Sequence, residues 1–234
     1  MQSLETLERA LREQIARVEL IAEIDITPEL TEQLGQLIAG LVQRLGQNEA
    51  TTVLEKRYPA SLVVFLVAQG IYGYREGDYW SGVAAITRID NNVAQRWGRI
   101  FEDLLRRWGK PLFPTLEGRR YVDRILIHGG IPDYCLPDFF THMLTPAVTR
   151  PDQAMLDLDE LIFEWLYATS RRYMTDKPVL RFLEHGGSIA NDFVARCLDM
   201  ASRHLETGVV PAPDEVGLPA RVVAKYAEWA TQRD

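Results

Sequence analysis

Residues 59–72 read PASLVVFLVAQGIY, and the part from Leu62 to Val67 is apolar without a break. A helix that is apolar on every side is normally buried at the centre of a bundle. Valine and phenylalanine also favour strands, but the chain has no second run of this kind with which such a strand would pair. We therefore expect a buried central helix from Pro59 to about Tyr72, surrounded by other helices.

The segments on either side carry the periodicity of one-sided helices. From Leu4 to Ile21, apolar residues follow one another at steps of three and four, which is the spacing of an amphipathic helix. A second helix is expected between Thr27, a capping residue followed by proline, and Gly46, a helix terminator. The same reasoning predicts helices over approximately residues 80–89, 93–108, 119–128, 136–148, 152–170, 178–185, 188–205 and 218–231.

The predicted fold class is all-α, an irregular orthogonal multi-helix bundle of roughly ten helices. The many glycine and proline joints favour this irregular packing over an up-and-down four-helix bundle. The proline-containing joints at residues 111–114 and 145–151 are too short to separate independent domains. We therefore assign residues 1–234 to a single helical domain. The alternative divides the chain near Pro114, into helical subdomains of residues 1–113 and 114–234.

The segment 93–108 is expected to contribute the largest side chains of the core. Its bulky apolar residues fall on one face of the predicted helix, at steps of three and four. These residues should be buried near the apolar run around Phe65. They include Trp97, Phe101, Leu104 and Trp108.

Composition and charge limit the classes of function. The formal net charge is −7 and the isoelectric point about 5.2, which disfavours a protein whose whole surface grips nucleic acid. No apolar run approaches the roughly 20 residues of a membrane span, and the N-terminal residues do not resemble a signal peptide. A cytoplasmic location without membrane attachment is therefore expected. Cys135 and Cys197 are far apart and are expected to be small buried core residues.

One stretch of the chain is basic, against the overall charge. Residues 96–124 contain eight arginine or lysine residues and four acidic ones. Arginines on an exposed helix face can bind phosphates or the carboxylates of a partner; the alternative is that they pair with carboxylates of this chain. We favour a protein partner over nucleic acid, because the acidic remainder would repel a long polyanion. The predicted binding patch comprises Arg96, Arg99, Arg106, Arg107, Lys110, Arg119 and Arg120, with Arg124 at its end.

Two similar segments place a histidine before a pair of glycines. Residues 124–130 read RILIHGG and residues 181–187 read RFLEHGG. Helix termination explains both, because histidine favours the last turn of a helix and glycine the position after it. The alternative is a catalytic site that uses His128, Asp138 and His185, with Cys135 as a further candidate. Asp138 and His142 alone are too few for a metal site, and no metal or cofactor is expected.

The sequence favours a non-enzymatic helical interaction module, a subunit or adaptor that docks a protein partner. Nucleic acid in the same complex is a second option, through the Arg96–Arg124 stretch. The favoured reading rests on the lack of a recognisable set of nucleophile, base and orienting group. An enzyme of unknown reaction, using the loop region from His128 to Asp138, is the alternative.

Overall fold

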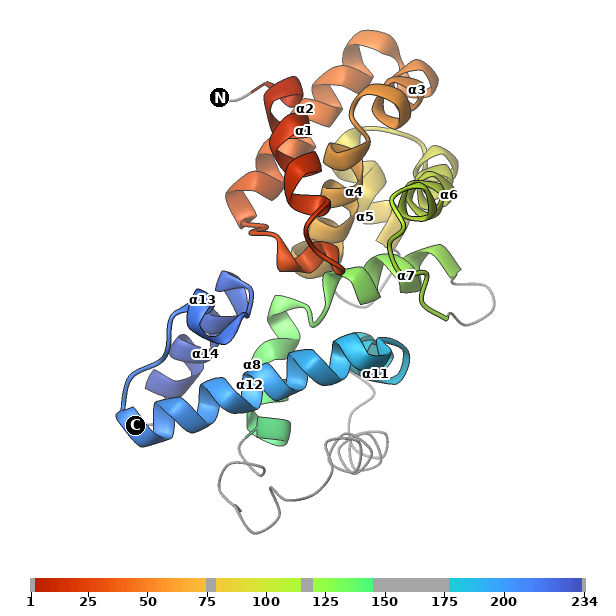
Figure 1. The fold of residues 1–234 in the computed structure, drawn as a ribbon. Coiled ribbons are helices and arrows are strands. Elements are labelled where there is room, and N and C mark those ends of the chain that lie inside the picture. The colour runs from red at the N-terminus through yellow and green to blue at the C-terminus, as the bar shows by residue number, and fades with distance from the viewer. Residues whose placement is uncertain (1–2, 75–78, 115–119, 145–176, 233–234) are drawn as a thin grey trace. The chain divides into compact units, whose positions relative to one another are not determined.

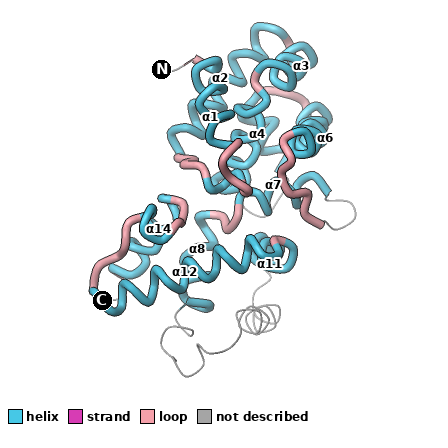
Figure 2. Tube along the Cα trace, viewed as in Figure 1, coloured by secondary structure: helices cyan, strands magenta, loops and turns pink. Residues whose placement is uncertain are grey.

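The computed structural model describes residues 3–74, 79–114, 120–144 and 177–232 (Figure 1). Within these ranges every regular element is a helix and none is a strand (Figure 2), which confirms the all-α prediction. None of the helices in these ranges combines the length and the apolar character needed to cross a membrane. The chain forms two compact units, residues 1–129 and residues 130–234, and each is described by itself.

Unit 1 is built around one fully buried helix. This helix, α4, spans Pro59–Ala68, and all ten of its residues are buried. It contacts α1, α2, α3, α6 and α7, and Figure 1 shows it among them. The prediction of a central apolar helix is therefore confirmed. The other helices of the unit are α1 (Leu4–Ile15), α2 (Pro28–Leu45), α3 (Gln47–Arg57), α5 (Tyr79–Thr87), α6 (Asn91–Arg107) and α7 (Arg120–Gly129).

The ends of α4 need partners from elsewhere in the chain. Its N-terminus begins with Pro59 and receives no hydrogen bond from the side chain of its own capping residue. The carboxylate of Glu8 on α1 serves instead. It accepts hydrogen bonds from the backbone N–H of Ala60 at 3.1 Å and of Ser61 at 2.8 Å, and from the Ser61 hydroxyl at 3.0 Å. Glu8 is only 6% exposed, so a buried charge caps a buried helix.

The C-terminus of α4 continues into a π-helical turn, Gln69–Gly73. The wider turn is closed by a hydrogen bond from the Tyr74 N–H to the Gln69 carbonyl at 2.8 Å. One turn earlier, the Leu66 carbonyl accepts a hydrogen bond from the Tyr79 hydroxyl at 2.6 Å. Burial raises the pKa of Tyr79, so this hydroxyl stays a donor. The Leu66 and Gln69 carbonyls at this end of the helix therefore have hydrogen-bond donors from within the protein.

The predicted core of α6 is confirmed. Trp97, Phe101 and Leu104 are buried, and Trp108 is partly buried against the same cluster, which includes Phe65. The Trp97 indole N–H donates to the Thr51 hydroxyl of α3 at 3.0 Å.

The helices of unit 1 differ from the sequence prediction in two respects. The first helix ends at Ile15, and a 3-10 turn, Ile21–Glu23, follows. Here the Glu23 carboxylate accepts from the backbone N–H of Glu19 at 3.0 Å and of Leu20 at 3.4 Å, which closes a local turn in place of helix. Helix α3 was not predicted. Its buried residues are only Ala50, Thr51 and Leu54, so its sequence lacks a clear apolar face.

Unit 2 packs its helices around aromatic side chains. A 3-10 turn (Asp133–Cys135) leads into α8 (Leu136–Phe139) and a second π-helical turn (Phe140–Leu144). Further along the chain are α11 (Lys177–His185), α12 (Gly187–Thr207), α13 (Pro213–Val216) and α14 (Ala220–Thr231). Helix α13 was not predicted. The predicted helix 152–170, and the end of the one predicted over 136–148, lie outside the described residues. Cys135 and Cys197 are both free and buried, as expected.

Candidate functional site

His128 has the environment of a core residue. It lies near the end of α7 in unit 1, is fully buried, and its Nε2 lies 3.0 Å from the Pro111 carbonyl oxygen. Phe101 and Phe113 pack edge-on against its ring, with centroids 5.9 and 5.2 Å away. Burial lowers the pKa of His128 from 6.5 to about 4, so the ring is neutral near pH 7. This setting is that of a neutral core residue, and interaction of a charged imidazole with the helix dipole does not explain its position.

The other two residues of the alternative catalytic site, Asp138 and His185, belong to unit 2. Asp138 is exposed on α8, and His185 ends α11 with its Nε2 3.9 Å from the Glu184 carboxylate. No hydrogen bond or ion pair joins Asp138 to His185 in the described structure. Both histidine-glycine segments do end helices, and Gly130 and Gly187 take the left-handed conformation with φ of 65° and 56°. Among the described residues, no three histidine, cysteine or acidic side chains are grouped as metal ligands.

The basic stretch makes several ion pairs within unit 1. Arg106 binds Glu102 at 2.7 Å and Asp103 at 2.8 Å, and Arg107 lies 3.7 Å from Glu55 of α3. Arg124 of α7 bonds to the same Glu102 carboxylate, which is 3% exposed, and so ties α7 to α6.

The remaining members of the predicted patch differ in their contacts. Arg96 donates to the Asn48 side chain at 3.2 Å, and Lys110 donates to the Val18 carbonyl. Arg99 is exposed, and its guanidinium has no partner among the described residues. Arg119 and the side chain of Arg120 lie outside the description. These contacts favour a structural role for part of the stretch, and its role as a binding patch stays a prediction.

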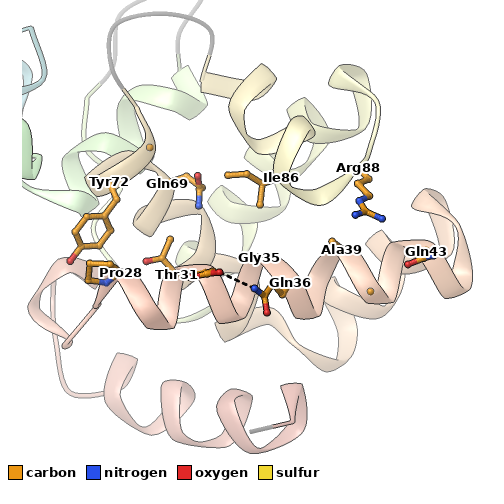
Figure 3. Close-up of a pocket in the computed structure, with 13 residues that line it drawn as sticks. Pro28, Thr31, Gly35, Gln36, Ala39, Gln43, Gln69, Tyr72, Ile86 and Arg88 are labelled. Atoms are coloured by element: carbon orange, nitrogen blue, oxygen red, sulfur yellow. Dashed lines mark hydrogen bonds between the residues drawn. The ribbon is translucent and has the colours of Figure 1, made fainter. Parts of the chain in front are cut away.

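A groove of about 600 Å³ lies along α2 in unit 1 (Figure 3). One wall is the face of α2 from Pro28 to Gln43, which carries the small residues Gly35, Ala39 and Gly40. The opposite wall comes from the π-helical turn and from the end of α5. Its members are Gln69, Tyr72, Gly73, Ile86 and Arg88.

Two close contacts hold the walls of the groove in place. A Cβ atom at Gly35 would lie 2.9 Å from Ile86 Cγ2, so the missing side chain lets α5 approach α2. At the Pro28 end, the Tyr72 hydroxyl donates to the Ile26 carbonyl at 2.6 Å. The groove is therefore bordered by packed elements rather than by an isolated loop.

The deepest polar group of the groove is Gln69. The residue is 6% exposed, yet its side-chain amide has no hydrogen-bond partner in the described part of the chain. Figure 3 shows this side chain beside α2, between Tyr72 and Ile86. Gly73 makes room for it, because a Cβ there would lie 2.7 Å from Gln69 Oε1. The Gln69 amide atoms are not among the fully buried polar atoms that lack a partner, so they reach solvent on the groove side, where a ligand can bond them.

Arg88 stands at the other end of the groove, near Gln43 in Figure 3. It is exposed, and its guanidinium has no ion pair or hydrogen bond with any described residue. Its backbone is left-handed, with φ of 59°, where helix ends normally have glycine. The nearby carboxylate of Asp90 is bound by Gln47 at 2.6 Å instead. The cation is therefore available to a ligand.

The groove can offer both donors and acceptors but has no nucleophile paired with a base. Gln36 donates to the Glu32 carboxylate at 3.0 Å, while Gln43 and Gln69 make no side-chain hydrogen bond to a described residue. A primary amide donates and accepts at once, which matches the N–H and C=O of a peptide group.

Sequence reasoning did not find this site. In the sequence, Gln69 looks like the first polar residue after an apolar helix, and Arg88 lies outside the basic stretch. The one available signal was the set of small residues in the predicted second helix, at positions 35, 39 and 40. In comparisons with family models, curated proteins and solved structures, the chain matches none of them.

Proposed function

We propose that unit 1 is a non-enzymatic docking module whose groove binds an extended segment of a partner protein. The observation that carries the proposal is the Gln69 amide, which makes no hydrogen bond to a described residue and lines the groove together with Gln36 and Gln43. An extended peptide exposes N–H and C=O groups along its length and can satisfy such amides.

The length of the groove suits a short extended segment. The α2 face from Pro28 to Gln43 is about 22 Å long at 1.5 Å per residue, which corresponds to about seven residues of extended chain.

A library of random heptapeptides displayed on phage tests the proposal with the full chain as bait. Gly40 and Gly82 provide a matched pair of variants, because both lie in helices and a Cβ at either meets nothing within 4 Å. Gly40 lines the groove and Gly82 does not. We expect one consensus on the wild type and on Gly82→Gln, and its loss on Gly40→Gln, whose new side chain enters the groove. Recovery of the same consensus on Gly40→Gln would contradict the proposal.

A second variant separates binding from folding. Gln69→Leu has a similar size and removes the unpaired amide, so the melting temperature should hold or rise. Binding of the synthetic consensus peptide, measured by fluorescence polarisation, should weaken about tenfold, the effect of one lost hydrogen bond to a buried group. Unchanged affinity in Gln69→Leu would remove the main support for the groove as the docking site.

A further inference from the structure

We infer that Arg88 makes the groove selective for a segment with an acidic side chain at the Gln43 end. The inference rests on the proposed docking function and names the chemistry of the partner. Its basis is a guanidinium that lines the groove, has no partner among the described residues, and sits in a chain of net charge −7.

Arg88 forms no ion pair with a carboxylate of the described structure. Across the groove it faces Ala39 and Gln43 of α2, which are neutral (Figure 3). Asp90, two residues along the chain, keeps its charge but accepts a hydrogen bond from the neutral Gln47 amide rather than from Arg88. The acidic residue that lines the groove, Glu32, lies three helical turns before Gln43 and accepts a hydrogen bond from Gln36. A carboxylate from the ligand therefore meets attraction at one end of the groove only.

The backbone at Arg88 supports a functional reason for the side chain. The α5 helix ends with a hydrogen bond from the Ile89 N–H to the Ala84 carbonyl at 3.3 Å, so Arg88 takes the position where glycine is favoured. A non-glycine residue there is strained. Strain alone assigns no ligand; the inference rests on the position of the guanidinium in the groove and its lack of a partner among the described residues.

We assign the carboxylate to an internal aspartate or glutamate of the partner. Capture of a C-terminal carboxylate normally uses several backbone N–H groups that converge on it. At this end the groove presents an exposed arginine on a flexible stem, past which a chain can continue. The acidic residue then lies near Gln43, and the other end of the segment lies near Tyr72.

A charge swap tests the inference. The probe is the heptapeptide consensus from the phage library, made with an amidated C-terminus, together with a version in which its acidic residue is lysine. Wild type should bind the acidic peptide about tenfold more tightly at low salt, and the preference should shrink as salt rises. Arg88→Glu should reverse the preference, while Arg44→Glu, an exposed charge change on α2 outside the groove, should weaken it through the field at low salt but not reverse it.

Two further readouts keep the outcomes distinct. Arg88→Gly should lose the acidic preference and melt at the same temperature as wild type or higher, because glycine relieves the left-handed strain. Groove-dependent binding without an acidic consensus, or without reversal in Arg88→Glu, overturns the inference and leaves the docking function standing. A preference that needs the free C-terminus overturns it as well. If no peptide binds in the groove, both proposals are overturned.

Discussion

Loss of the Glu8 carboxylate should strongly destabilise unit 1. In Glu8→Ala, the buried N–H groups of Ala60 and Ser61 lose their acceptor. Each buried donor left without a partner costs about 1–3 kcal/mol. The ion pair with Arg12, whose side chain is 58% exposed, adds little. We therefore expect the free energy of unfolding to fall by about 3–5 kcal/mol, a large part of the typical total.

Urea denaturation followed by circular dichroism at 222 nm measures this effect. Glu13→Ala is the matched control, since Glu13 lies on the same helix and is exposed; it should change the free energy of unfolding by less than about 0.5 kcal/mol. Glu8→Gln keeps one acceptor oxygen and should fall between the two, at about 1–2 kcal/mol. If Glu8→Ala cost no more than Glu13→Ala, the cap would contribute nothing and the reasoning on α4 would be wrong.

Three further changes probe the same unit. Trp97→Ala should lower the free energy of unfolding by about 3–5 kcal/mol in urea denaturation, because the side chain is fully buried and bonded to Thr51; a loss below about 1 kcal/mol would contradict the core assignment. Because the pKa of His128 falls from 6.5 to about 4 on folding, stability present above pH 6.5 should be lost as the pH falls toward 4. The shift is worth about 3 kcal/mol, and His128→Gln should lack this part of the pH profile. Gly98→Ala should cost about 1–3 kcal/mol, because its Cβ would lie 2.6 Å from a neighbouring side chain, whereas Gly82→Ala should gain up to about 1 kcal/mol; equal melting temperatures would contradict the close packing.

Much of the fold followed from the sequence because helical periodicity is a local signal. The run around Phe65 was apolar on every side, and a helix of that kind has only one stable place. Helix α3 was not predicted because few of its residues are buried. Its stability comes from packing against other helices, which sequence periodicity does not show. The continuation of the first helix to Ile21 was wrong because Glu23 offers the backbone a competing turn.

The site was hidden because its chemistry depends on long-range contacts. The arginines of α6 suggested a binding surface, but the pairing of Arg106 and Arg107 with Glu102 and Glu55 depends on helix packing. The state of Gln69 is equally non-local, since its burial and its lack of a partner arise from the approach of α2 and α5. Sequence spacing shows which residues share a helix face, but not which polar group on it is left without a partner.

The groove follows from how a fully buried helix has to end. Helix α4 is buried at both termini, so its first N–H groups and last carbonyls need partners inside the protein. At the N-terminus, Glu8 supplies them, and that end is closed. At the C-terminus, the chain widens into a π-helical turn, a form often found at functional sites, and the Tyr79 hydroxyl takes one carbonyl. The same turn carries Gln69 into the space beside α2, where its amide finds no partner among the described residues. The π-helical turn that ends the central helix therefore also places in the groove the amide on which the proposed docking function depends.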